Sequence, residues 1–222
     1  LAPTDHDPTR LSVDEEARVG QAVRAMIRQR APEINQGRLR EKLDRLIQPL
    51  LADRKRKELE YRLVVLDSNS VNIFSHLGGM IYVHRGLAFL AATDAEFQFV
   101  LAREIAHLDE KHSASRVAAS RTRLRQAGQL EAAADLPRLV FDQISQGYTE
   151  DQDLRADDWA FLELKRLDRF DREILTWLNK LAGYQPPPTS PLDAEFDRHL
   201  LTQPPASMRF QRLRSRSTTP TR

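Results

Sequence analysis

Apolar residues recur at three- and four-residue steps through most of the chain, which is the spacing of one face of an α-helix. The clearest run carries Leu39, Leu43, Leu46, Ile47 and Leu50. Two capping boxes, in which a hydroxyl precedes a glutamate by three positions, begin at Ser12 and Thr93. The pattern predicts helices over 13–30, 36–51, 93–117 or beyond, 150–167 and 171–181, and a mainly helical stretch over 118–147 interrupted at Gly128 and Pro137.

Two short segments break this helical spacing. Residues 61–67 and 80–84 are rich in β-branched and aromatic side chains and are bounded by Ser, Asn and Gly, so both are predicted to be strands. Gly78 and Gly79 between them permit a tight turn or the close approach of another backbone. Trp159 and Trp177 lie at apolar positions of predicted helices and are expected in the core. We therefore expect an α+β fold that is mainly helical, with a small sheet.

The two ends and one internal segment differ in composition from the rest. Residues 1–10 are polar with two prolines and are expected to form a flexible leader, and residues 185–191 contain four prolines typical of a stiff linker. The basic residues 214–222 combine arginine with Ser, Thr and Pro, which predicts a disordered tail. We therefore expect a single domain over residues 11–213, between the leader and the tail.

Composition excludes several classes of function. The 222 residues are 41% hydrophobic, which suits one sizeable core, and 34 Lys and Arg against 32 Asp and Glu argue against nucleic-acid binding. The arginines at 121, 123 and 125 are expected on a solvated face. Cysteine is absent, which removes disulfides and thiolate metal sites. No apolar run approaches the roughly 20 residues that cross a bilayer, so no transmembrane segment is predicted in this chain.

The segment Arg103-Glu104-Ile105-Ala106-His107 differs at one position from the motif H-E-x-x-H, in which two histidines one helical turn apart hold zinc. Glu104 lies one turn before Leu108 on the apolar side of its helix, so a solvated carboxylate fits poorly; a special role or a structural ion pair remains open. Taken alone, His107 would be interpreted as a core histidine bonded to a backbone carbonyl. Because it follows Glu104 in this motif, the interpretation that His107 is a metal ligand is favoured.

These segments resemble, in order and over residues 11–213, the gluzincin metallopeptidases that include CAAX prenyl proteases, HtpX-like proteases and their soluble bacterial relatives. The matching segments are residues 71–74, 78–83 and 85–87, then 94–96, 100–107 and 112–114. The resemblance implies a zincin-like domain with its sheet beside the motif helix and a β-edge above the active site. It also implies that substrate is bound by Asn72, Phe74, Gly78, Gly79 and Tyr82.

The resemblance also identifies where this chain departs from a working peptidase. The family's third zinc ligand is a glutamate four residues before an aspartate; Asp153 takes the ligand position and Asp157 the orienting position. The family's later His-Pro segment and arginine match Gln203 and Arg209, so glutamine replaces a histidine that assists catalysis. Together with Arg103, three site positions have changed. The resemblance therefore implies a degenerate site in which Glu104 holds the general-base position.

Arg103 offers a replacement for the metal. Its guanidinium is expected to reach Asp153 or Glu104 with a fork of donors suited to two carboxylate oxygens. The competing interpretation is that Arg103 extends along the helix to solvent. His112 is expected near a helix end as a polar surface residue.

Three functions are compatible with the sequence. The favoured hypothesis is a noncatalytic, cofactor-free metallopeptidase-like protein of the bacterial periplasm or envelope that binds extended or unfolded polypeptide, or an envelope assembly partner, in a retained groove. The alternative is an active zinc endopeptidase in which His107 and Asp153 bind zinc. In this alternative, Glu104 is the general base, and His76, His84 or His112 completes the zinc-ligand shell. A helical adaptor without a groove is the third.

Overall fold

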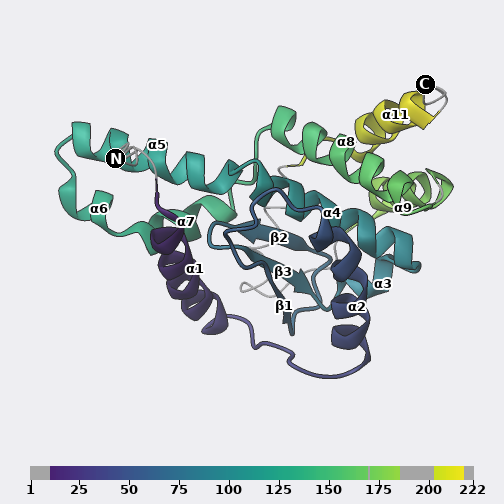
Figure 1. The fold of residues 1–222 in the computed structure, drawn as a ribbon, viewed down its shortest axis with the longest axis horizontal. Coiled ribbons are helices and arrows are strands. Elements are labelled where there is room, and N and C mark those ends of the chain that lie inside the picture. Colours follow the sequence, from purple (N-terminus) through teal and green to yellow (C-terminus); the bar gives the residue numbers. More distant parts are fainter. Residues whose placement is uncertain (1–10, 170, 186–202, 218–222) are drawn as a thin grey trace.

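The computed structural model describes residues 11–169, 171–185 and 203–217 as helices packed around a small sheet (Figure 1). In chain order the described elements are α1 (Val13–Arg28), α2 (Arg38–Ala52), β1 (Arg62–Leu66), β2 (Ile73–His76), β3 (Met80–His84), α3 (Leu87–Leu90), α4 (Asp94–Asp109), α5 (His112–Gln126), α6 (Leu130–Ala134), α7 (Leu136–Ile144), α8 (Glu150–Arg166), α9 (Asp171–Gly183) and α11 (Ala206–Ser217). The expectation of a mainly helical α+β fold is confirmed.

The sheet has the order β1-β3-β2, with β3 parallel to β1 and antiparallel to β2. Residue patterns alone predict β1 and β3, whereas β2 was indicated only by the family resemblance. Gly78 and Gly79 form the β2–β3 turn at φ 85° and 78°. A Cβ at Gly78 would lie 2.6 Å from the carbonyl oxygen of Glu16, and one at Gly79 would lie 2.1 Å from that of Glu60. The turn and the close backbone approach are both confirmed.

Each face of the sheet packs into its own apolar cluster because side chains alternate along a strand. Ile73 and Ile81 join the cluster that contains residues of α2, α4, α8 and α9. Phe74 and Tyr82 point to the other face, among residues of α1, α5 and α7. Trp177 is buried in the first cluster and Trp159, half-buried, packs against it, as predicted. In Figure 1, α1 and α7 likewise lie on one side of the sheet and α2 lies on the other.

The helix predicted over 93–117 is instead two helices, α4 and α5. Lys111 breaks the helix with a left-handed backbone at φ 57°. Asp109, the last residue of α4, is buried and accepts hydrogen bonds from the Tyr61 hydroxyl at 2.6 Å and the Lys55 backbone N–H at 2.9 Å. These bonds hold the carboxylate at the end of α4 against the segment that contains Lys55 and Tyr61. Gly128 does interrupt the helical stretch that follows, and a second break at Asp135 separates α6 from α7, which has Pro137 in its first turn.

The end of the described chain also differs from expectation. Helix α11 continues to Ser217, past position 214 where the tail was predicted to begin. Arg216 pairs with Asp158 of α8 at 2.7 Å, which ties the last turn of the helix to the domain. The predicted leader at 1–10, the linker residues 186–191 and the tail residues 218–222 lie outside the described residues. None of the helices described in the structure is long and apolar enough to cross a membrane.

Candidate functional site

Helix α4 presents the motif residues to the interior of the protein. Its start is fixed by a capping box in which the Thr93 hydroxyl accepts from the Glu96 N–H and the Glu96 carboxylate accepts from the Thr93 N–H. The sheet and α8 pack against α4, so Arg103, Glu104 and His107 are each at most 2% exposed. The predicted burial of Glu104 is confirmed.

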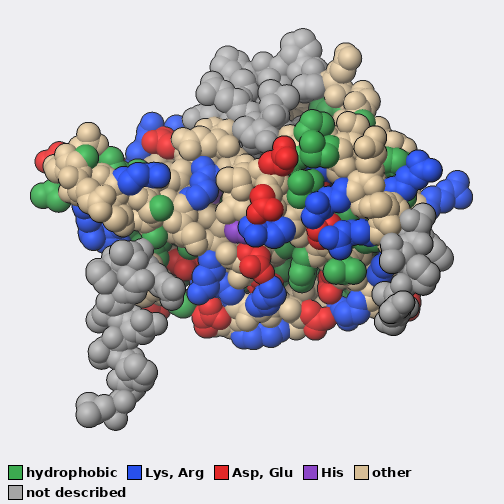
Figure 2. Space-filling view, turned by 90° about the horizontal axis from the view of Figure 1, so that it is seen from above, with side chains coloured by type: hydrophobic (Ala, Val, Ile, Leu, Met, Phe, Trp, Pro, Cys, Tyr) green, Lys and Arg blue, Asp and Glu red, His purple; other side chains and the backbone are tan. Residues whose placement is uncertain are grey.

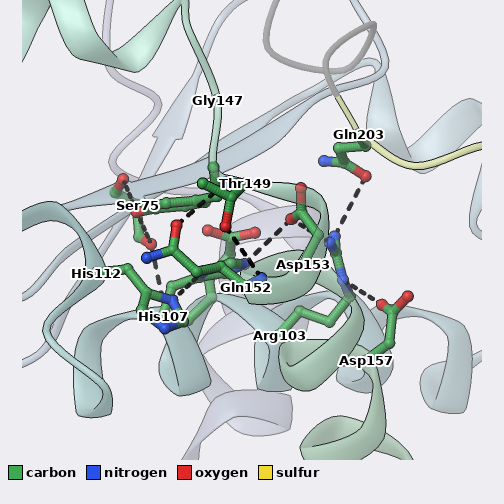
Figure 3. Close-up of polar contacts among 12 residues, drawn as sticks. Ser75, Arg103, His107, His112, Gly147, Thr149, Gln152, Asp153, Asp157 and Gln203 are labelled. Carbon is green, nitrogen blue, oxygen red and sulfur yellow. Dashed lines mark hydrogen bonds and ion pairs between the residues drawn. The ribbon is translucent and has the colours of Figure 1, made fainter. Parts of the chain in front are cut away.

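The Arg103 guanidinium lies between the two carboxylates of α8 (Figure 3). Its Nη2 donates to Asp153 Oδ1 at 3.0 Å, and its Nε forms an ion pair with Asp157 Oδ1 at 2.5 Å. The predicted contact with Asp153 is confirmed, and the alternative in which Arg103 extends to solvent is wrong. Since Asp153 and Asp157 are one turn apart on α8, a single planar guanidinium can reach both.

Helix α11 adds a second guanidinium to the cluster. Arg209 donates through Nε and Nη2 to the two oxygens of Asp157, at 2.6 and 2.9 Å. Its Nη1 donates to Gln203 Oε1 at 2.9 Å, and Arg103 Nη1 donates to the same oxygen at 3.4 Å. The four residues predicted from the later part of the chain, Asp153, Asp157, Gln203 and Arg209, therefore meet at Arg103.

This cluster is balanced in charge without a metal. Two buried guanidiniums, those of Arg103 and Arg209, face two buried carboxylates, those of Asp153 and Asp157. Burial raises the pKa of the Glu104 carboxyl to about 7, so near neutral pH this group carries only part of a negative charge. Its Oε2 has no hydrogen-bond partner among the described residues. A divalent cation placed here would leave two positive charges uncompensated.

His107 lies at the other side of Asp153 and contacts both Asp153 and His112. Its Nε2 is 3.4 Å from Asp153 Oδ1, and its Nδ1 is 2.8 Å from the Nδ1 of His112. The prediction that His112 is a polar surface residue is wrong, because the break after α4 folds α5 back and buries its first residue. Burial lowers the pKa of His107 to about 4, so the imidazole is neutral at pH 7.

Tyr148 covers this histidine and was missed by sequence reasoning. Its ring stacks on the His107 ring, with centroids 3.8 Å apart and planes 10° from parallel. Its hydroxyl donates to the backbone oxygen of Ser75 in β2 at 3.0 Å. A signal was present in the sequence, since Tyr148 directly precedes the capping box of Thr149 and Gln152 that opens the helix carrying Asp153.

The free edge of β2 is formed by residues other than those predicted to bind substrate. The His84 N–H donates to Asn72 O at 3.0 Å, so the backbone groups of Asn72 face β3. Backbone direction alternates along an antiparallel strand, so Phe74 also faces β3, while the backbone groups of Ile73 and Ser75 face away from it. Tyr82 lies in the central strand, and its ring stacks on that of Phe74 on the face away from α4.

Four of the five residues predicted to bind substrate lie away from Glu104. Phe74 and Tyr82 pack in the other apolar cluster because side chains alternate along a strand, and Gly78 and Gly79 form the turn beside α1. Asn72 alone lies at the site, where it lines a small cavity beside Arg103.

Comparison with known proteins identifies the family. Residues 33–217, well over half of the chain, match Peptidase family M48. The chain belongs to this family. It is 32% identical over 104 residues to a Vibrio cholerae protein provisionally named a beta-barrel assembly-enhancing protease, and 27% and 24% identical over 104 residues to the beta-barrel assembly-enhancing proteases of Yersinia pestis and Escherichia coli K12. The match covers 47% of this chain but only 21–22% of those proteins.

Membership of M48 implies a zinc ion, and the residues present do not fit one. By the family resemblance, His107 and Asp153 would supply two of the three protein ligands that a catalytic zinc needs, and Arg103 would occupy the position of the other. His76 bonds instead to Leu77 O and Tyr82 OH, and His84 to Ser70, so neither completes the shell. No group of three or more candidate ligands suited to a metal occurs within the described ranges.

Proposed function

We propose that this M48 protein is noncatalytic and binds extended polypeptide along the free edge of β2. The observation that carries the proposal is the Arg103 guanidinium, which is buried between Asp153 and Asp157 in the position of a zinc-binding imidazole. A guanidinium satisfies carboxylates but cannot lower the pKa of a bound water as zinc does. Peptide addition to a strand edge uses backbone hydrogen bonds alone and requires no metal.

The proposed binding edge is the outward backbone of Ile73 and Ser75, and both residues are buried in the free protein. In the free protein the Ile73 N–H is bonded to Asn72 Oδ1 at 2.8 Å and the Ser75 carbonyl to the Tyr148 hydroxyl at 3.0 Å. An incoming strand would take over these donors and acceptors, so binding exchanges side-chain bonds for main-chain ones. These two outward groups therefore keep partners when the edge is empty, which protects them from pairing with another chain.

The setting is proposed from the relatives. Their names connect them with β-barrel assembly, and we place the partner of this chain in the same bacterial envelope, as an extended or unfolded segment of an envelope protein. Figure 2 shows basic and acidic side chains interspersed on the displayed face, without a broad patch of one sign. Such a surface gives no support to a nucleic-acid partner.

The test combines metal content, proteolysis and peptide binding. The protein is purified without chelator, its zinc is measured by mass spectrometry, and it is incubated with an unfolded casein substrate. The proposal expects substoichiometric zinc, no cleavage, and saturable binding of an extended peptide. Stoichiometric zinc with chelator-sensitive cleavage would establish the zinc endopeptidase instead, and failure to bind any extended peptide would favour a helical adaptor.

A further inference from the structure

A groove of about 550 Å³ lies beside β1, on the opposite edge of the sheet from β2. Ile47 and Leu51 of α2 line one side of it, Arg24 of α1 also lines it, and Leu63 belongs to the strand itself. Ligand pockets commonly measure about 300–1,000 Å³, so the groove is large enough to hold a bound molecule. None of its lining comes from the helices that carry the charge cluster, so it is separate from the site at Arg103.

Residues 32–34 already use part of this edge as an added strand. The Ile34 N–H donates to Val65 O at 2.8 Å, in a short antiparallel pairing. After Ile34 the chain leaves the edge for α2, which begins at Arg38. The pairing therefore stops just before the part of β1 that lines the groove, and the groove continues the line along which the pairing would extend.

The backbone of Leu63 faces the groove and keeps capacity for further hydrogen bonds. The Arg62 N–H donates to Gly79 O at 2.8 Å, so by alternation in a parallel ladder the backbone groups of Leu63 point away from β3. Leu63 O accepts from Arg40 Nη1 at 2.7 Å, and a carbonyl oxygen has a second lone pair. The Leu63 N–H has no hydrogen bond to another described residue. Both groups can therefore pair with an added strand.

We propose that this groove, here named the β1 groove, binds a short extended segment of another polypeptide as an additional strand. The segment continues the antiparallel pairing of residues 32–34 and exchanges both main-chain bonds with Leu63. A second folded copy of this domain would bring its own α2 to the same edge, so an extended segment fits the groove better than another β1. The β1 groove is independent of the binding proposed at β2, which lies on the other edge of the sheet.

The two sides of the groove determine the side-chain pattern of the segment. Residues opposite each other in a sheet direct their side chains to the same face, and Leu63 packs in the apolar cluster that contains residues of α2. The residue paired with Leu63 therefore directs its side chain toward Ile47 and Leu51. The next residue faces α1, where Arg24 is bonded to both carboxylate oxygens of Glu33 and offers polar surface rather than a free charge. The segment is expected to alternate apolar and polar side chains, with the apolar ones on the residues whose backbone pairs with β1.

Three peptides of about eight residues, a typical strand length, test this pattern. The first alternates valine and threonine between terminal lysines that keep it soluble. The second carries N-methyl groups on its valines, which removes the N–H groups expected to face β1, and the third carries them on its threonines. Each peptide has a photoreactive diazirine analogue of leucine in place of one valine, so crosslinks located by mass spectrometry report where it binds. The first and third are expected to crosslink to α2, and the second about tenfold less, since it loses main-chain bonds.

A variant of α2 connects these crosslinks to the groove. Gln48→Trp places a large ring in the groove from an exposed position of its lining, and is expected to reduce crosslinking to α2 about tenfold. Arg45→Trp is the matched control, because Arg45 is exposed on the same helix outside the lining, and it should leave the crosslinks unchanged. Circular dichroism shows that both variants are folded.

The outcomes distinguish the β1 groove from the function proposed at β2. Crosslinks confined to residues 72–76 and 147–149 overturn the β1 groove and leave binding at β2 intact, whereas crosslinks to α2 alone contradict the binding at β2. Equal crosslinking to α2 by the two methylated peptides overturns strand addition, and so does unchanged crosslinking in folded Gln48→Trp. Dimerisation of the wild-type protein that Gln48→Trp abolishes would place a second copy in the groove and overturn the assigned occupant.

Discussion

Arg103 and a zinc ion can both satisfy Asp153, but they do different chemistry. The guanidinium spreads its charge over a plane and directs its donors at fixed angles, so it holds carboxylates in place. Zinc accepts electron pairs and makes bound water acidic near neutral pH, which a guanidinium does not do. At the residue scale, the Arg103 guanidinium on α4 therefore holds the carboxylate of Asp153 without supplying a Lewis acid.

Arg103→His is expected to restore zinc binding without restoring robust proteolysis. The new imidazole would join His107 and Asp153 as a third donor, whereas the glutamine at 203 remains where the family resemblance places a catalytic histidine. Zinc per protein is measured by mass spectrometry beside casein cleavage, with Arg103→Gln as the neutral control. Rapid cleavage by the single histidine variant would contradict the roles given to Asp153 and Gln203.

Glu104 gives the protein a pH-dependent stability whose sign follows from its raised pKa. Its pKa rises from 4.5 to about 7, first because of burial, so the folded state holds a proton that the unfolded state releases. The stability that this proton provides is complete below pH 4.5 and is lost as pH rises to about 7. Glu104→Gln is therefore expected to be more stable than wild type at pH 8, by up to roughly 3 kcal/mol.

Urea unfolding of both proteins at pH 5 and pH 8 measures this difference. The advantage of Glu104→Gln should be larger at pH 8. Glu41→Gln, at an exposed position of α2, should show no comparable change between the two pH values. A constant difference between wild type and Glu104→Gln would show that the carboxyl is ionised in the folded protein throughout this range.

At the element scale, the site depends on how β2 lies against α4 and on the loop that precedes α8. The Ser75 carbonyl points away from β3, and the loop before α8 brings the Tyr148 hydroxyl to that carbonyl. The same tyrosine packs on His107, so the segment before α8 closes the site over α4. Access to the strand edge therefore depends on one hydroxyl and on the position of one ring.

Tyr148→Phe is expected to increase peptide affinity about fivefold, because the incoming strand no longer competes with the phenol for Ser75 O. The ring stacking on His107 is retained, so the fold should lose only about 1 kcal/mol of stability. Peptide anisotropy and urea unfolding check the two effects. Tyr61→Phe, which removes a hydroxyl bonded to Asp109 away from β2, is the control and should leave peptide affinity unchanged.

Sequence reasoning reached the site helix because its signals are local. The capping box at Thr93 and the apolar positions around Glu104 predict where α4 begins and what it buries. It failed where the outcome depends on contacts between distant segments. Lys111 carries no turn signal in the sequence, yet its left-handed backbone ends the run of helix beside Asp109, which bonds to residues of another segment. Which residues of β2 form the free edge depends on pairing with β3, which no single segment encodes.

At the scale of the whole molecule, the charge cluster connects three helices from distant parts of the chain. Arg103 joins α4 to α8, and Arg209 joins α11 to α8 through Asp157. The site is thus part of what holds the fold together, and ion pairs supply that link. We expect EDTA to leave the thermal unfolding midpoint unchanged, as measured by circular dichroism with and without added zinc. A decrease of several degrees in EDTA would show that a bound metal contributes to stability.

Asp157→Asn tests whether this link stabilises the fold. The substitution keeps the shape of the side chain but leaves two buried guanidiniums facing the single carboxylate of Asp153, and breaking a buried pair in this way costs about 3–5 kcal/mol. The control is Asp151→Asn on the same helix, where the exposed pair with Arg155 contributes about 0–1 kcal/mol. Urea unfolding measures both. Equal, small losses would mean that water or an ionised Glu104 compensates for the missing carboxylate.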